Sequence, residues 1–286
     1  MERFKEAYNK KCKNILSYKI ILAKIMKECM EEYKDYDMHT IMNCIEYENP
    51  SNKIIGITND LDDIKYDVFY YATNPMTKHK IGALINIEAQ KTSRLKYKIH
   101  NRALVYAGYE IAYQYNRIFK NQEYDLLQKV VSIWICFDAP TKEEENSITY
   151  FSLFKDVKVG YNIVRKEEYD KLLIVIIYLG ENSYQNEFIS FLEVLFTNQL
   201  TVNDKKRILE NKYQIPVDDR MKGELEGMCN LADRIEEKAI EKGQMKAVVN
   251  IIKKLNVSFD EAIRILEVPE YLIASCREYV NKMLSV

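Results

Sequence analysis

The segment Lys129–Phe137, KVVSIWICF, is almost wholly apolar. A strand that is buried on both faces has this pattern, because neither face carries polar side chains for solvent. A second run of the same kind, LLIVIIYL, spans Leu172–Leu179. Strands buried on both faces are typical of sheets that helices cover, so these two runs predict an α/β core.

Apolar periodicity and turn signals predict further elements around these two strands. The additional strands are expected at Ile54–Ile57, Ile64–Ala72, Ile81–Gln90 and Ile148–Phe154. The first 50 residues are expected to be mainly helical, and Thr92–Phe119 a long helix that crosses the sheet. The chain up to about residue 180 is therefore predicted to form one α/β domain, residues 1–180.

Beyond residue 180 only helical patterns are found, which predicts an all-helical C-terminal appendage, residues 181–286. A long charged helix is expected at Asp218–Lys242, and Ser258 with Glu261 forms a capping-box pattern. The other helices are predicted at Phe188–Leu200, at Val202–Lys212 with Thr201 as its start, and at Val248–Leu255, Ser258–Leu266 and Glu270–Leu284. We expect this appendage to mediate a homodimer or to dock a partner, and for the charged helix a solvated helix packed against the core is a further alternative.

Composition excludes several classes of protein. The 286 residues are 47% hydrophobic and 30% charged, with a net charge of −1, which argues against long disorder. The six cysteines show no metal-ligand spacing, and the start lacks the layout of a signal peptide. No apolar run approaches 18 residues. We therefore expect a reduced, cytoplasmic protein that does not enter membranes.

Positive charge is concentrated in two stretches. Seven lysines and arginines lie between Tyr71 and Arg102, against Glu88 alone, and eight lie in the first 27 residues, against two glutamates. Such stripes favour phosphate groups, although a solvated helix face also explains the N-terminal one.

A small cluster of hard oxygen ligands is expected where two predicted strands adjoin. Glu88 and Gln90 are two residues apart, so in a strand they share one face, and Asp67 lies in the preceding strand. The turn-like segment between the strands contains Asn74-Pro75. Two carboxylates and the backbone carbonyl of Ala89 suit Mg²⁺ or Mn²⁺. The alternative is that Asp67 and Glu88 pair with lysines at 65, 80 or 91 on a solvated face.

Several motifs resemble, in order, the Rpn-type, transposase-associated branch of the PD-(D/E)xK nuclease superfamily. They are Asp67, INIEAQ at 85–90, Tyr97 with Arg102 and Tyr106, KVVSIWIC at 129–136, and GELEGMCNLADRIEEKAIEKG at 223–243. The resemblance covers roughly residues 40–245. It implies a restriction-endonuclease-like mixed sheet flanked by helices, and Mg²⁺-dependent cleavage of DNA in transposition or recombination.

Position by position, the resemblance makes Asp67 and Glu88 the two acids of the motif and Asp60 a further acid. Gln90 stands where the superfamily usually has lysine, so it would orient water or the scissile phosphate. Lys91, Arg94 and Arg102 are candidates for DNA phosphates. For Arg102, an ion pair with Asp67 or Glu88 is an equal alternative.

The predicted function is thus metal-dependent DNA endonuclease activity. The alternative is a non-catalytic module that binds DNA or protein on a nuclease fold without turnover, since Gln90 removes a cation that could stabilise the transition state. Three scattered histidines match no ligand spacing, and the chain has no glycine-rich phosphate loop. Trp134 is expected in the core.

Overall fold

A computed structural model describes residues 2–46, 67–88, 95–180, 186–197 and 199–284 of the chain. Two compact units make up the chain. One comprises residues 9–228 and contains the sheet, and the other comprises the first eight residues with residues 229–286. The two units are described separately below.

The larger unit contains a mixed sheet of five strands in the order β1-β2-β3-β5-β4. The three central strands are parallel to one another, and the two edge strands are antiparallel to their neighbours. The strands are β1 (Val68–Thr73), β2 (Lys80–Glu88), β3 (Lys129–Cys136), β4 (Ser147–Ser152) and β5 (Leu172–Tyr178). This mixed arrangement confirms the predicted α/β class.

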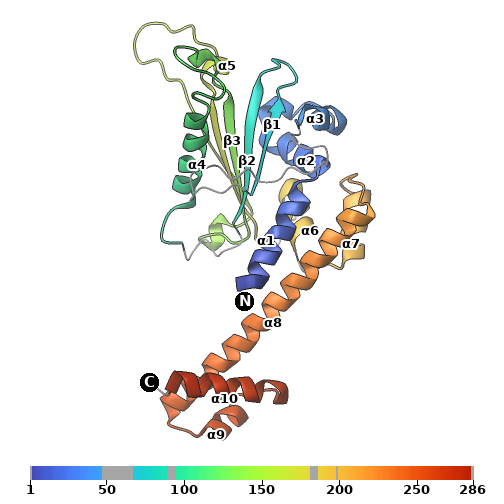
Figure 1. The fold of residues 1–286 in the computed structure, drawn as a ribbon, viewed down its shortest axis with the longest axis vertical. Coiled ribbons are helices and arrows are strands. Elements are labelled where there is room, and N and C mark those ends of the chain that lie inside the picture. Colours follow the sequence, from blue (N-terminus) through green and yellow to red (C-terminus); the bar gives the residue numbers. More distant parts are fainter. Residues whose placement is uncertain (1, 47–66, 89–94, 181–185, 198, 285–286) are drawn as a thin grey trace. The chain divides into compact units, whose positions relative to one another are not determined.

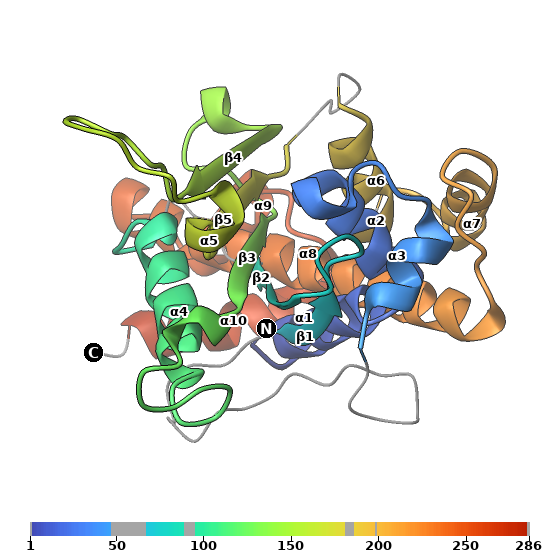
Figure 2. The ribbon, with the colours of Figure 1, turned by 90° about the horizontal axis from the view of Figure 1, so that it is seen from above.

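The two apolar runs of the sequence are the central strands β3 and β5, which are buried almost throughout. Both faces of the sheet are covered by helices (Figures 1 and 2). Helix α4 (Ile99–Tyr113) covers one face, where its apolar residues pack with Trp134 and Ile176. Helices α2 (Lys19–Cys29), α3 (Met38–Cys44) and α6 (Glu187–Phe196) lie on the other. Trp134 is buried, as predicted.

The connection between β1 and β2 is a tight turn held by Asn74. The Asn74 side chain accepts hydrogen bonds from the backbone N–H groups of Met76 and Thr77, and its own N–H donates to the carbonyl of His79. Lys78 adopts a positive φ of 59°. An asparagine that bonds the backbone two and three residues on is a common way to close such turns, and the predicted turn is confirmed.

The remaining short elements of the larger unit connect these layers. They are η1 (Glu31–Tyr33), η3 (Tyr124–Leu126), η4 (Lys142–Glu144), α5 (Lys166–Tyr169) and α7 (Val202–Asn211). Asn186 and Thr201 cap α6 and α7 by accepting from backbone N–H groups, so the predicted start of α7 is confirmed. Helix α1 (Glu2–Leu16) begins in the smaller unit and ends in this one.

Helix α8 (Asp219–Leu255) is longer than predicted and also belongs to both units. The sequence predicts two helices, Asp218–Lys242 and Val248–Leu255, but the helix continues through Gly243. A glycine within a helix costs roughly 1 kcal/mol relative to alanine. Burial of Val248 and Val249 against the two helices that follow stabilises the C-terminal part of α8 and offsets this cost.

Those two helices complete the smaller unit. Helix α9 (Phe259–Ile265) starts at Ser258, whose hydroxyl accepts from the Glu261 N–H, as the capping pattern predicts. Helix α10 (Glu270–Leu284) has the predicted bounds. The apolar cluster between the three helices includes Ala262, Leu272 and Cys276. Among the residues that the structure describes, none of the helices has the length and apolarity needed to cross a bilayer.

Candidate functional site

Asp67 and Glu88 belong to the same end of the β1–β2 hairpin. Asp67 forms a bend directly before β1, and Glu88 is the last residue of β2. The register pairs Val68 with Ile85, so the chain at Asp67 runs beside the last residues of β2. The backbone of Glu88 pairs with Cys136 at the end of β3. Both acidic positions therefore lie at the C-terminal ends of the parallel strands, the usual place for ligands in open α/β sheets.

The carboxylate of Asp67 is paired with a lysine from helix α1. The Nζ of Lys13 lies 2.6 Å from Asp67 Oδ1, and the Asp67 side chain is 17% exposed. None of the lysines considered in the sequence is this partner, and Lys80 instead pairs with Glu46 at 2.8 Å. A lysine in the N-terminal basic stretch thus reaches the candidate site, and its side chain is 40% exposed there.

Several candidate residues fall outside the described part of the chain. They are Asp60, Ala89, Gln90, Lys91 and Arg94, and for Glu88 only the backbone is described. Within the described residues no group of three or more histidine, cysteine, aspartate or glutamate side chains gathers as a metal site. The donors that the sequence supplies here are carboxylate oxygens, which suit a hard cation such as Mg²⁺ and not a soft one.

Arg102 lies in the first turns of α4, over the sheet. Its guanidinium donates to the hydroxyls of Tyr97, at 3.0 Å, and Tyr106, at 3.1 Å. Its central carbon also lies 5.3 Å from the ring centroid of Trp134. Hydroxyl and ring contacts of this kind hold a guanidinium in place. The guanidinium of Arg102 therefore has a fixed position above β3, which is compatible with either expected role of Arg102.

The sequence-based prediction did not include two further residues that lie near the C-terminal ends of the parallel strands. Lys13 was seen only as one of many N-terminal cations, since nothing in a local pattern shows which helix face meets β1. Asp138 follows the end of β3, two residues after Cys136, whose backbone pairs with Glu88. A polar residue directly after a buried parallel strand is the signal that indicates such a position.

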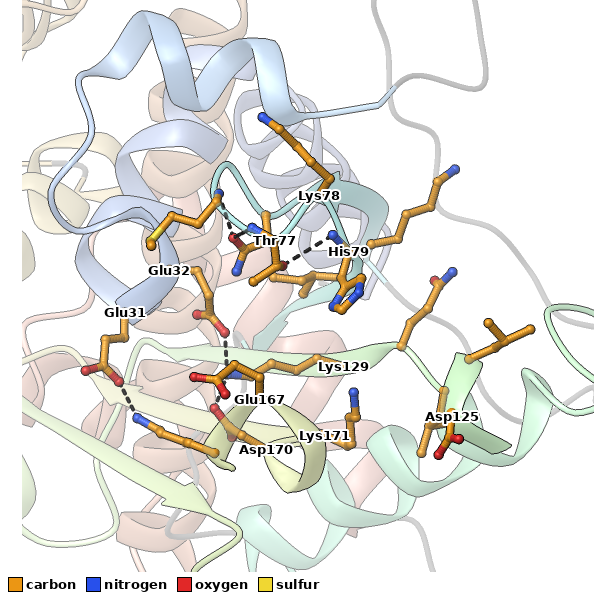
Figure 3. A pocket seen from close by; sticks show the side chains of 18 of the residues that line it. Glu31, Glu32, Thr77, Lys78, His79, Asp125, Lys129, Glu167, Asp170 and Lys171 are labelled. Carbon is orange, nitrogen blue, oxygen red and sulfur yellow. Dashed lines mark hydrogen bonds and ion pairs between the residues drawn. The ribbon is translucent and has the colours of Figure 1, made fainter. Parts of the chain in front are cut away.

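A cavity of about 760 Å³ lies at the N-terminal ends of the parallel strands, beside the starts of β2 and β3 (Figure 3). Its lining carries both acids and bases, among them Glu31, Glu32, His79, Lys129, Asp170 and Lys171. The β2 strand separates this cavity from Glu88. At about 3.3 Å per residue, the nine residues of β2 put the two ends of this strand about 25 Å apart. The cavity is therefore no part of the Asp67–Glu88 site.

Two lysines of the cavity, Lys129 and Lys166, are paired with carboxylates that also line it. Lys129 Nζ lies 2.6 Å from Glu32 and 2.8 Å from Asp170, and Figure 3 shows it between these two carboxylates. Lys166 bonds Glu31 at 2.6 Å. That hydrogen bond raises the pKa of Lys166 and lowers the pKa of Glu31 from their ordinary values. These pairs join η1, β3 and the α5 region, which is a structural role.

Comparisons with models of protein families, with curated proteins and with solved structures give no match to this chain.

Proposed function

We propose that this chain is a Mg²⁺-dependent DNA endonuclease of the transposase-associated type that its motifs resemble. One observation carries the proposal: the backbone positions of Asp67 and Glu88 share one end of the β1–β2 hairpin, where the parallel strands have their C-terminal ends. The sequence predicts the same neighbourhood from the two adjoining strands and from the order of the motifs. The restriction-endonuclease-like core that the resemblance implies stays part of the proposal.

The connectivity of the sheet supports the same assignment. An antiparallel hairpin, β1–β2, is followed by helix α4 and then by β3 parallel to β2. A strand, helix and parallel strand in succession cover the sheet with the connecting helix. In this chain that helix also carries Arg102 over the sheet. A single stretch of chain thus supplies the acids and a fixed cation.

Asp67 and Glu88, with the carbonyl of Ala89, are the proposed ligands of Mg²⁺ or Mn²⁺. When bound, the metal would supply an activated water and would stabilise the negative charge that develops on the oxygens of the phosphate. Gln90 orients the attacking water or bonds the scissile phosphate. Asp60 is a further acid in this proposal.

Lys13 fills the place of the lysine that Gln90 replaces. Its ammonium already lies within 2.6 Å of Asp67, so a cation is held beside the proposed reacting centre from another element. Ammonium groups near a transferring phosphoryl group stabilise the charge that develops there. Lys91, Arg94 and Arg102 are proposed to bind the flanking DNA phosphates, so binding should weaken with salt.

The test is nicking of supercoiled plasmid in Mg²⁺, with EDTA as the metal-free control. We expect wild type to nick, and Asp67→Ala and Glu88→Ala to lose activity. Lys13→Met should reduce the rate by about 10²–10³-fold, the usual effect of removing one stabilising donor. Lys10→Met is the matched control, because Lys10 is an exposed lysine on the same helix, and it should nick normally.

Equal nicking by wild type, Asp67→Ala and Glu88→Ala would reject the site. Normal nicking by Lys13→Met would reject the role of Lys13 alone. Folding is checked by thermal unfolding, where loss of the half-exposed Lys13–Asp67 pair should cost no more than about 1 kcal/mol.

The second candidate function is a non-catalytic module that binds DNA or protein. The ion pair of Asp67 with Lys13 favours it, because a carboxylate that is already neutralised has less need of a metal. Such a module binds DNA equally with and without Mg²⁺ and leaves it uncut. The enzyme instead binds Mg²⁺ or Mn²⁺ in calorimetry, and Glu88→Ala abolishes that heat.

A further inference from the structure

Tyr97 is an exposed aromatic residue that is held in a fixed position just before helix α4. The residue is 47% exposed, and its hydroxyl accepts a hydrogen bond of 3.0 Å from Arg102 Nη1. Arg102 is held in turn by the hydroxyl of Tyr106 and lies over the ring of Trp134. An exposed ring is usually free to turn in solvent, whereas the Tyr97 ring is anchored through its hydroxyl.

The anchoring contact leaves the faces of the Tyr97 ring open. The nitrogen of Arg102 lies 3.0 Å from the Tyr97 hydroxyl, whereas its central carbon lies 5.9 Å from the ring centroid. The guanidinium is therefore at the hydroxyl end of the ring and not against one of its faces. A half-exposed ring that is fixed at this end offers a rigid flat surface to another planar group.

Two lysines flank Tyr97 in the sequence, without acidic residues beside them. Lys96 and Lys98 are exposed, and within the part of the chain that the structure describes neither side chain forms an ion pair. The sequence has no aspartate or glutamate between Lys91 and Tyr109. Helix α4 begins directly after Lys98 with its positive dipole end, and its first turn contains no acid. Positive charge is thus concentrated where it cannot stabilise the helix and where it attracts anions.

A second pair of exposed rings lies beside the first turn of α4. The ring centroids of His100 and of Phe151 on β4 are 5.8 Å apart, and the two planes are inclined by 30°. Phe151 is 42% exposed, and His100 is exposed as well. The start of α4 therefore combines two cations with two separate aromatic surfaces.

Cations beside exposed rings are the features with which proteins bind single-stranded nucleic acids. The cations attract the phosphates, and each ring takes the face of an unpaired base. In a duplex the bases are stacked on one another, so their faces cannot reach a protein ring unless a base leaves the stack. A duplex would therefore contact the lysines and leave both aromatic surfaces unused.

This surface adjoins the proposed nuclease site. Trp134, over which the anchored guanidinium lies, pairs in register with Asn86 of β2. Asn86 lies two residues before Glu88, so at about 3.3 Å per residue the two backbone positions are about 7 Å apart. A strand that stacks on Tyr97 therefore passes close to the proposed metal ligands.

We propose that the start of α4, residues 96–100 together with Phe151, binds single-stranded DNA, and that unpaired strands are the substrate of the neighbouring site. One base stacks on the ring of Tyr97 and another on the pair of His100 and Phe151, while Lys96 and Lys98 hold phosphates. The inference rests on the proposed function, which supplies DNA as the ligand, and it adds the class of DNA.

The first test measures the binding of fluorescent oligonucleotides to the full chain by anisotropy, in EDTA so that no strand is cut. The probes are a DNA strand of mixed sequence, its duplex, and an RNA of the same sequence. We expect wild type to bind the DNA strand about tenfold more tightly than the duplex. Tyr97→Ala should weaken binding of the strand by about 5–150-fold, the usual effect of removing one stacking ring, and should leave duplex binding unchanged.

Three variants separate stacking from other effects of the change at Tyr97. Tyr97→Phe loses the hydrogen bond to Arg102 but keeps the ring, so it should bind the strand nearly as well as wild type. Phe151→Ala should weaken binding of the strand but not of the duplex. Tyr161→Ala is the matched control, because Tyr161 is a 90% exposed tyrosine elsewhere in the larger unit, and it should bind normally.

The second test uses salt to count phosphate contacts. Each phosphate contact with a single strand contributes about 0.7 to the slope of log affinity against log salt concentration. Lys96→Gln and Lys98→Gln should therefore each make this slope shallower by about 0.7. Lys120→Gln changes an exposed lysine after the other end of α4, and it should keep the wild-type slope.

Equal affinity of wild type for the strand and the duplex overturns the inference, and so does normal binding of the strand by Tyr97→Ala. If Tyr97→Phe binds as weakly as Tyr97→Ala, the ring does not stack on a base and the inference is also wrong. Tighter binding of the RNA through Tyr97 overturns DNA as the ligand. Unchanged salt slopes for both lysine variants reject their phosphate contacts.

Cleavage in Mg²⁺ distinguishes this inference from the proposed function. A chain that nicks plasmid but shows no preference for single strands keeps the nuclease activity and refutes the inference. A chain that binds single strands through Tyr97 and cuts no DNA contradicts the nuclease activity, whereas the binding surface remains supported.

Discussion

Replacing Lys129 by methionine should destabilise the larger unit more than any other single change at a charged residue of its cavity. The Lys129 side chain is 11% exposed, and its partners Glu32 and Asp170 are 15% and 17% exposed. The variant Lys129→Met keeps most of the apolar stem but leaves two largely buried carboxylates without their cation. Such groups cannot recover full hydration while the fold persists.

The magnitude follows from this burial. Breaking a buried ion pair by removing one partner costs about 3–5 kcal/mol, whereas an exposed pair contributes about 0–1 kcal/mol. Since the three side chains keep some contact with solvent, we expect about 3 kcal/mol. For a unit of this size, that loss should lower the melting temperature by about 6–12 °C.

Urea unfolding followed by Trp134 fluorescence is the suitable assay, because the single tryptophan lies on the same strand as Lys129. Lys166→Met is the control: its pair with Glu31 is mostly exposed, and it should change stability by less than about 1 kcal/mol. Adding Glu32→Gln and Asp170→Asn to Lys129→Met should restore most of the loss. A cost for Lys129→Met as small as that for Lys166→Met would refute the reasoning.

Three further predictions concern aromatic residues. The buried hydroxyl of Tyr70 makes no hydrogen bond within the described residues, so Tyr70→Phe should leave stability unchanged or raise it by about 1 kcal/mol. Tyr33→Phe loses a hydrogen bond to a backbone carbonyl, so it should cost about 1 kcal/mol in the same urea assay. Burial raises the pKa of Tyr150 and of Tyr178 to about 12, so the folded protein holds these protons more tightly than the unfolded chain does. The contribution of these two groups to stability is therefore complete below pH 10 and is lost as the pH rises toward 12. Absorbance at 295 nm should show a late phase of tyrosine ionisation that denaturant removes. Trp134 is buried, so its emission should be blue-shifted and poorly quenched by acrylamide until the protein unfolds; full quenching of the native protein would contradict its place in the core.

The sequence predicts most elements of the sheet because their signals are local. An apolar run such as Lys129–Phe137 has no polar face, so it can only be a buried element whatever surrounds it. Thr201 and Ser258 begin helices because a short hydroxyl side chain can bond the N–H groups that the first helical turn leaves free. Asn74 closes its turn for a similar reason.

The candidate site could be predicted only in part, because its parts come from distant segments. The strand pattern and the motif order predict Asp67 and Glu88, and the strand register gives the backbone neighbourhood. Lys13 could not be chosen among the N-terminal cations, since the pairing depends on where α1 lies against the sheet. Asp60, Gln90 and Arg94 lie outside the described residues, so their roles stay predictions.

The sequence by itself determined most of the strands and helices that the structure describes, where several of them start, and that the core is α/β. The strand predicted at Ile54–Ile57 lies outside the described residues. Hydrophobic patterning and capping act within a few residues, which is why these features can be seen in one stretch of chain. Only the tertiary structure decided that β5 lies between β3 and β4, that α8 continues through Gly243, and that a lysine of α1 pairs with Asp67. Each of these depends on contacts between segments far apart in the chain, whose energies outweigh local preference.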